Sequence, residues 1–299
     1  MRSDQVRLNS GITLPVLGFG TYSFANDKAT TEHAVHLALK MGYRHFDTAK
    51  IYGSEPALGN ALNEAILDGC VKREDVFVTS KLWGSDHHDP VSALKQTLKN
   101  LGMEYIDMYL VHWPVKLKPW AVYPVPNEED FEKLDIEATW VAMERCLELG
   151  LCRTIGVSNF SSKKIQRLLD FASVPPAVNQ VEMHPMWRQS KLREVCGEHK
   201  IHVSAYSPLG GPGNSWGSTA VVEHPIIQAI ALKHKATPAQ SFNQERIREN
   251  MASFNLKLDD EDLIQIDNLE EWKIMRGDFL INQTTSPYRT LEDLWDYEI

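Results

Sequence analysis

The sequence predicts an α/β fold in which parallel strands form a barrel surrounded by helices, as one domain over residues 1–299. Seven short apolar runs of strand-like composition alternate with helical segments. The links between them are short, which is typical of parallel strands covered by helices. An open dinucleotide-binding sheet is disfavoured, because no G-x-G-x-x-G run follows a strand and Gly18-Phe19-Gly20 lacks the third glycine.

The elements follow from local patterns along the chain. Alternating apolar residues from Val6 to Val16, around Asn9-Ser10-Gly11, predict a β-hairpin ahead of the barrel. The seven predicted barrel strands cover residues 16–20, 43–48, 75–81, 105–112, 152–158, 177–183 and 201–207. Between them, apolar residues recur at helical spacing. Two examples are Trp140, Met143 and Leu147 before Gly150, and Ile165, Leu168 and Leu169 after Ser161-Ser162.

Three long stretches interrupt this rhythm, at residues 114–135, 210–223 and 272–299. Long loops at one end of a barrel usually line the functional site. The alternative is that they are surface insertions, and for the tail from Trp272 to Ile299 the sequence favours neither.

Composition excludes several classes of protein. A hydrophobic content of 43% is ordinary for a globular chain, and a net charge of −9 argues against nucleic-acid or anionic-membrane partners. The four cysteines show no CxxC spacing, so neither a metal nor a redox pair is indicated. The N-terminus has no apolar targeting segment, and no run approaches the ~20 apolar residues of a membrane span. We expect a cytoplasmic monomer that acts on a small molecule.

Four candidate catalytic residues, Asp47, Tyr52, Lys81 and His112, each follow a predicted strand. Residues just past the ends of barrel strands converge on one face. A tyrosine hydroxyl titrates near pH ~10, so we expect Lys81 to favour the ionised form of Tyr52 and Asp47 to balance the lysine charge. His112 would orient a substrate oxygen or share the proton. Together the four predict proton donation to a carbonyl.

The motifs around these residues resemble the aldo-keto reductase superfamily. They are Gly42-Tyr43-Arg44-His45-Phe46-Asp47-Thr48-Ala49, Tyr52-Gly53, Ser80-Lys81-Leu82-Trp83 and Leu110-Val111-His112-Trp113-Pro114, with V-S-N-F at 157–160 and N-Q-V-E at 179–182. The resemblance covers nearly the whole chain and is greatest to plant members such as the chalcone, codeinone and methylecgonone reductases. It implies an eight-stranded (β/α)8 barrel and reduction of an aldehyde or ketone.

The resemblance also implies NADPH as the cofactor, since no side chain supplies a hydride. Ser158, Asn159 and Gln180 would hold the carboxamide, and Tyr206 would stack on the nicotinamide. The other implied cofactor contacts are Gly20, Thr21, Asp47, Ser207, Leu209, Ser241, Asn243, Arg246, Glu249 and Asn250, the last five at the ribose phosphate and adenine. Tyr22, Trp83, His112 and Trp113 would form the substrate pocket. In proteins outside this family, amides such as Asn159 and Gln180 more often cap loops or are hydrogen-bonded in the interior. A charged run such as QERIRENM is more often a solvent-exposed helix face.

The chain departs from the family near its end. Thr237-Pro238 is a strong helix start, yet no helix body follows it, and no strand is predicted after Tyr206. The family places the rest of this helix, the eighth strand and a phosphate-binding lysine between Gln240 and Ser241. We therefore expect a barrel that lacks its eighth strand, with unpaired strand edges, a displaced phosphate-binding run and lowered stability.

Three functions remain from the sequence. The first is an NADPH-dependent carbonyl reductase with Tyr52 as general acid. The second is a catalytically impaired or non-catalytic binding protein on the same scaffold, which the missing strand favours and the intact catalytic set disfavours. The third, a barrel isomerase or hydrolase, would need paired carboxylates or metal ligands, and Asp47 and Glu182 alone do not supply them.

Overall fold

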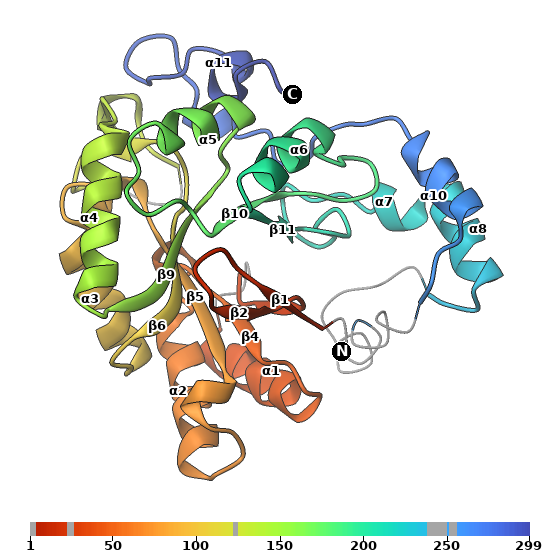
Figure 1. Ribbon diagram of the computed structural model, residues 1–299, viewed down its shortest axis with the longest axis horizontal. Coiled ribbons are helices and arrows are strands. Elements are labelled where there is room, and N and C mark those ends of the chain that lie inside the picture. Colours follow the sequence, from red (N-terminus) through yellow and green to blue (C-terminus); the bar gives the residue numbers. More distant parts are fainter. Residues whose placement is uncertain (1–3, 23–26, 122–124, 238–249, 251–255) are drawn as a thin grey trace.

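A computed structural model describes residues 4–22, 27–121, 125–237, 250 and 256–299. Seven parallel strands form one curled sheet in the order β11-β10-β9-β6-β5-β4-β3 (Figure 1). Their bounds are β3 Gly18–Gly20, β4 His45–Asp47, β5 Phe77–Leu82, β6 Ile106–Val111, β9 Cys152–Ser158, β10 Val178–Glu182 and β11 His202–Tyr206. All seven predicted strands are confirmed.

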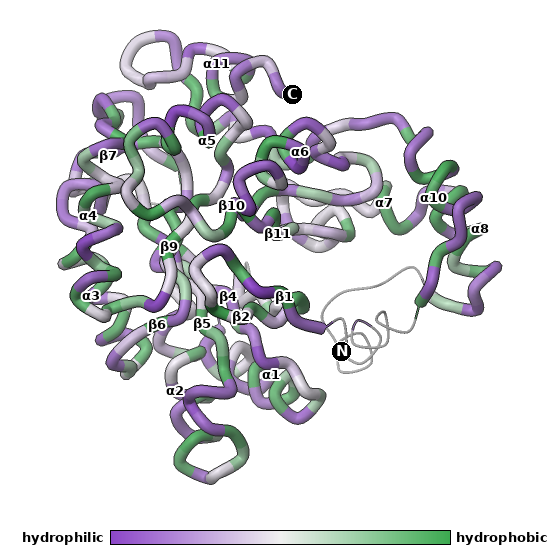
Figure 2. The backbone as a smooth tube through the Cα atoms, viewed as in Figure 1, coloured by the Kyte–Doolittle hydropathy of each residue, from purple (hydrophilic) through white to green (hydrophobic). Residues whose placement is uncertain are grey.

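Helices cover the outer face of this sheet (Figure 1). They are α1 Lys28–Lys40, α2 Glu55–Leu67, α3 Pro90–Leu101, α4 Ile136–Glu148, α5 Ser162–Leu169 and α6 Ser190–Glu198. Asp27, Asp89, Asp135 and Ser161 cap four of them by accepting a backbone N–H with the side chain. Hydrophobic and hydrophilic residues alternate along these helices (Figure 2), and apolar residues at helical spacing, such as Trp140 and Ile165, are fully buried in the core.

The predicted hairpin is also present and precedes the barrel. Strands β1, Gln5–Arg7, and β2, Thr13–Pro15, pair antiparallel. Leu8 and Leu14 of the hairpin are buried in one cluster with Phe77 and Val178, the first residues of β5 and β10. The hairpin therefore packs at the end where the strands begin, which leaves the opposite end for the functional site.

The sheet has two free edges within the described residues, because no strand pairs with the outer side of β3 or β11. The closed eight-stranded barrel of the family is therefore not formed by this part of the chain. Three further helices follow β11: α7 Ala220–Glu223, α8 Pro225–Lys233 and α10 Asp260–Asp267. Helices α8 and α10 lie side by side at the right-hand edge of the view, away from α1–α5 (Figure 1).

Ion pairs join α8 to α10. Lys233 Nζ lies 2.8 Å from Asp262 and 2.7 Å from Asp259, and His234 Nε2 lies 2.5 Å from Asp262. His234 and the two aspartates are near enough to hold a metal ion. However, Lys233 Nζ already lies within ion-pair distance of both carboxylates, so the cluster acts as a link between helices.

Two of the long stretches meet over the carboxyl ends of the strands. The first holds the short antiparallel pair β7 Lys116–Leu117 and β8 Phe131–Glu132; the tail holds the 3-10 turn Asp278–Leu280 and α11 Leu291–Trp295. Leu280, Leu294 and Trp295 are buried in one cluster with Trp83 and Trp113. The tail therefore packs against two of the residues predicted for the substrate pocket. The remaining 3-10 turns are Lys50–Tyr52, Arg73–Asp75, Gly84–Asp86 and Glu128–Asp130. None of the described helices is long and apolar enough to cross a membrane.

Candidate active site

Neighbouring strands bring the four candidate catalytic residues together. Asp47 ends β4, Lys81 lies near the end of β5 and His112 follows β6, so the three lie on adjacent strands at the same end of the sheet. Tyr52 ends the 3-10 turn that follows β4. The four residues, separated by up to 65 positions in sequence, lie together because parallel strands all end on the same face.

Lys81 is the centre of this group. Its side chain is 1% exposed, and its Nζ donates to the Asp47 carboxylate and, at 2.9 Å, to the Thr48 carbonyl oxygen. The Tyr52 hydroxyl lies 3.4 Å from the same nitrogen. Burial lowers the pKa of Lys81 and the adjacent Asp47 carboxylate raises it in part. Because the buried Lys81 ammonium is shielded from water, the Asp47 carboxylate balances its charge.

The expected lowering of the Tyr52 pKa is wrong for this structure. Burial raises the pKa of Tyr52 well above 10, and the negative charge of Asp47 raises it further. Lys81 does not offset these effects, because its charge is already paired with Asp47. Tyr52 is consequently a protonated donor at neutral pH.

His112 is held as a neutral imidazole. Burial lowers its pKa well below 6.5, and the positive charge of Lys81 lowers it further. Its ring lies edge-on to Tyr52, with 5.7 Å between the ring centroids. A neutral histidine beside a protonated tyrosine suits hydrogen bonding to a substrate oxygen more than proton release.

A second group of polar residues borders the first. The Tyr206 hydroxyl donates to Asn159 Oδ1 at 2.8 Å, and Asn159 Nδ2 donates to the His112 carbonyl oxygen at 2.9 Å. Ser158 Oγ donates to the Gln180 carbonyl oxygen at 2.7 Å. Gln180 Nε2 donates to Asp47 Oδ2 at 2.9 Å. These bonds connect the residues expected at a nicotinamide directly to the Lys81–Asp47 pair.

Aromatic rings form the wall beside Tyr52 and His112. Tyr22 lies 5.0 Å from the Tyr52 ring, and Trp83 lies 5.6 Å from the His112 ring, between centroids. Trp113 turns toward the tail, where its ring lies 5.9 Å from that of Trp295 and 5.6 Å from that of Phe279. The predicted substrate wall therefore combines residues after β5 and β6 with the C-terminal segment.

The remaining predicted cofactor residues divide into three sets. Gly20 and Thr21 lie beside Asp47, since Thr21 N donates to the Asp47 carbonyl oxygen at 2.9 Å. Ser207 and Leu209 follow Tyr206 in a turn where Gly210 N donates to the Ser207 carbonyl oxygen. Ser241, Asn243, Arg246 and Glu249 lie outside the described residues, as does the continuation from Pro238.

Asn250 is not placed with the others. Its side chain hydrogen-bonds to Tyr43, which precedes β4, whereas the catalytic group follows β4. The rest of the expected phosphate-binding run lies outside the described residues, so its displacement stays a prediction. The cofactor role expected for Asn250 is therefore not supported by its contacts.

Sequence reasoning missed several residues that support the site. Thr48 supplies a carbonyl oxygen to Lys81, and the Ser54 hydroxyl bonds both Thr48 at 3.0 Å and Thr21 at 2.8 Å. Thr48 lies in the quoted motif that contains Asp47, and Ser54 directly follows Tyr52-Gly53, so their proximity was available as a signal. The role of Trp295 had no such signal, because it depends on the path of the tail.

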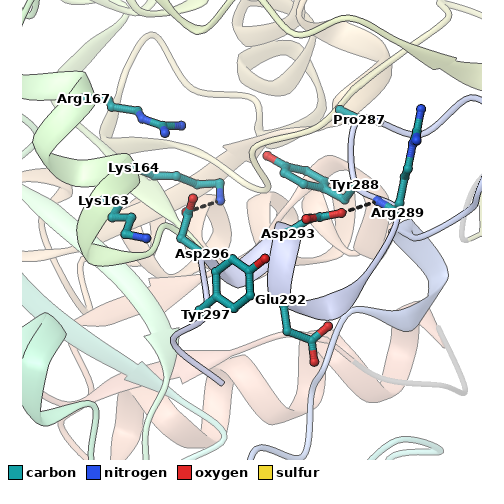
Figure 3. Close-up of a pocket in the computed structure, with 10 residues that line it drawn as sticks. All are labelled: Lys163, Lys164, Arg167, Pro287, Tyr288, Arg289, Glu292, Asp293, Asp296 and Tyr297. Atoms are coloured by element: carbon teal, nitrogen blue, oxygen red, sulfur yellow. Dashed lines mark hydrogen bonds and ion pairs between the residues drawn. The ribbon is translucent and has the colours of Figure 1, made fainter.

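A separate pocket of about 490 Å³ lies between α5 and the tail (Figure 3). Its lining includes Lys164, Arg167, Tyr288 and Asp296, and none of its ten lining residues was predicted as a site residue. Lys164 and Asp296 form an ion pair of 2.6 Å across it. The pocket thus belongs to the attachment of the tail rather than to the catalytic group.

Comparison with known proteins identifies the relatives of this chain. The sequence model of the Aldo/keto reductase family matches residues 16–216. The 7-acetyl-epi-neemfruitin B aldo-keto reductase of Melia azedarach is 45% identical, with 97% of this chain and 96% of the relative covered. Deoxymugineic acid synthase 1-A of Triticum aestivum is 44% identical, with 96% and 97% covered. The crystal structure of a Bombyx mori aldo-keto reductase with NADP matches with a TM-score of 0.82 at 32% identity, covering 92% and 95%.

The alignments also contain a gap. That with the Melia azedarach protein spans 310 positions, while 97% of the 299 residues here is about 290, so about 20 positions of the relative have no counterpart in this chain. A strand of ~5 residues and most of a helix of ~11 would account for most of that length.

Proposed function

This chain belongs to the aldo/keto reductase family, and on that premise we propose that it reduces the carbonyl of a small aldehyde or ketone to an alcohol with NADPH. One observation carries the proposal. The buried Lys81 ammonium contacts Asp47 and lies 3.4 Å from the Tyr52 hydroxyl, beside the neutral ring of His112. This arrangement offers a proton and a hydrogen bond to the same substrate oxygen.

Each residue has a distinct role in this reaction. Tyr52, protonated at neutral pH, gives its hydroxyl proton to the oxygen that becomes negative as hydride reaches the carbonyl carbon. The Lys81 ammonium, which is paired with Asp47 and held in place by it, lies 3.4 Å from the Tyr52 oxygen and would donate a hydrogen bond to the phenolate that remains. His112 hydrogen-bonds the same oxygen and orients it.

The residues at the nicotinamide end fit a bound NADPH, which would supply the hydride. Asn159 and Gln180 carry amide groups beside Asp47 and His112, which suits a carboxamide, and Tyr206 presents a ring next to them. The Melia azedarach relative is named as an aldo-keto reductase, and the Bombyx mori structure is a complex with NADP. For the phosphate end, the proposed contacts at Ser241 and Arg246 rest on the family motif alone.

The substrate that we propose is an apolar or aromatic carbonyl compound. Tyr22 lies against Tyr52 and Trp83 lies against His112, while Trp113 continues the aromatic surface to Phe279 and Trp295. Such rings contribute burial and shape without supplying charges. We further propose that the chain acts as a cytoplasmic monomer, for which its unpaired cysteines and net charge of −9 are the supporting features.

The Tyr52→Phe variant tests the proposal. Removing the hydroxyl should lower kcat for reduction of an aromatic aldehyde by about 10³-fold, while the Kd for NADPH changes less than about twofold. NADPH binding is followed by quenching of tryptophan fluorescence, with NADH as the comparison. Tyr105→Phe, which changes a tyrosine just before β6 at the other end of the sheet, serves as the matched control. Retained turnover in Tyr52→Phe would contradict the role of Tyr52.

The second candidate function is a cofactor-binding protein with impaired catalysis. The free edges of β3 and β11 and the position of Asn250 favour it. The same titration separates the two. NADPH-selective binding with turnover supports the reductase, binding without turnover supports the second function, and absence of binding contradicts both.

A further inference from the structure

Glu182 is a buried carboxylate that the proposed chemistry does not use. It ends β10, two residues after Gln180, and its side chain is 0% exposed. Its Oε1 accepts from Ile274 N at 2.8 Å and lies 3.0 Å from His184 Nε2, and its Oε2 accepts from Met275 N at 2.8 Å. One side chain of the sheet therefore binds two backbone amides of the tail, 92 and 93 positions away.

Lys273 completes this contact from the tail. Its side chain is 1% exposed, and its Nζ lies 3.7 Å from Glu182 Oε2. The ammonium also lies 3.8 Å from the centre of the Trp295 ring and 5.3 Å from that of Trp187. Burial lowers the pKa of Lys273 to about 8, and the Glu182 carboxylate opposes this effect. A buried ammonium without its counter-ion would be costly, so the two residues depend on each other.

Trp295 connects Lys273 with Trp113, which is predicted to form part of the substrate pocket. Its Nε1 donates to the Arg276 carbonyl oxygen at 2.7 Å, and its ring packs on Trp113, the residue after His112. The tail passes so near Trp113 that a Cβ at Gly277 would lie 3.3 Å from a Trp113 ring carbon. The Lys164–Asp296 pair fixes the far end of the tail on α5 (Figure 3).

We propose that Glu182, with Lys273, is a positioning residue that holds residues 272–299 against Trp113 and so fixes the outer wall of the substrate pocket. It touches neither the reacting carbonyl nor the four catalytic side chains. Glu182 therefore affects the binding of a bulky substrate, which is measured as its KM. This inference rests on the proposed reductase function for its kinetic consequence, and on the contacts alone for its structural one.

The variants Glu182→Gln, Lys273→Met and the double variant test it. The side-chain amide introduced by Glu182→Gln would turn an N–H toward a backbone donor, so this variant should raise KM for 2-naphthaldehyde about tenfold. Its kcat/KM for propanal, which is too small to reach the tail, should stay within about twofold of the wild-type value. The two residues form one pair. The increase in KM for 2-naphthaldehyde in the double variant should therefore be smaller than the two single increases predict when combined. Lys99→Met, at an exposed lysine on α3, is the control.

Hydrogen exchange gives a second, independent measurement. Amides of residues 272–299 should exchange about tenfold faster in Glu182→Gln and Lys273→Met, while amides of β5 and β6 keep their protection. Unchanged tail exchange, or equal losses for propanal and 2-naphthaldehyde, would overturn the inference. If the wild-type protein reduces neither aldehyde, the proposed function fails, and the exchange data still decide whether Glu182 holds the tail.

Discussion

At the scale of single residues, burial controls the chemistry of this site more than neighbouring charges do. Lys81 was expected to lower the pKa of Tyr52, yet that pKa lies well above 10 because the hydroxyl is buried and faces Asp47. Burial likewise keeps His112 neutral. A charged residue shifts the pKa of its neighbour effectively only when no nearer counter-ion neutralises it, and Asp47 contacts Lys81 directly.

The pH dependence of reduction follows from these shifts. Tyr52 remains protonated and His112 remains neutral between about pH 6.5 and 8, because the pKa of Tyr52 lies above this range and that of His112 below it. We expect kcat for a saturating aldehyde to vary less than about twofold over this interval, measured by loss of NADPH absorbance. A break near pH ~6.5 that disappears in His112→Asn would show that His112 titrates at its ordinary value.

At the scale of elements, five of the seven described strands pair with a strand on both sides, whereas β3 and β11 each pair on one side only. Helices α8 and α10, which follow β11, leave large apolar side chains in solvent, with Leu232 81% and Ile264 61% exposed. Free strand edges and exposed apolar helix faces are the expected result when an element that should cover them is absent. The gap of about 20 positions against the Melia azedarach relative supports the same view.

Inserting the segment that we expect to be missing should stabilise the protein. Insertion between Gln240 and Ser241 of the corresponding segment of a longer relative should raise the melting temperature by ~4 °C or more, since even ~1 kcal/mol shifts a chain of this size by a few degrees. Affinity for NADPH should rise as well. A Gly/Ser insertion of equal length is the control. Equal melting curves for the original, restored and control chains would show that the barrel does not need this segment.

At the scale of the whole molecule, burial of neutral histidines couples folding to pH. Burial lowers the pKa of His45 to about 4 and that of His87 to about 3, and it lowers that of His112 well below 6.5. The three lie at separate places: beside Thr79, beside Thr139 and in the active site. In the unfolded chain all three would take up a proton near pH ~6.5.

The sign of the stability change follows directly. Below pH ~6.5 the unfolded state binds more protons than the folded state, so the free energy of unfolding falls as pH falls toward the folded pKa values. Each of the three histidines contributes about 1.4 kcal/mol per pH unit in that interval. We expect a marked fall in melting temperature between about pH 7 and pH 5. His87→Asn should make the fall shallower, whereas His33→Asn, at an exposed position on α1, should leave it unchanged.

Local sequence patterns were enough to predict the seven parallel strands, the hairpin, the helices at Trp140 and Ile165, and the convergence of the four candidate catalytic residues. These follow from apolar periodicity and from the rule that parallel strands end on one face. The raised pKa of Tyr52, the contact of Asn250 with Tyr43, and the attachment of the tail by Glu182 and Lys273 emerged only from the folded structure. Those features depend on burial and on contacts between distant segments, and no local pattern encodes either.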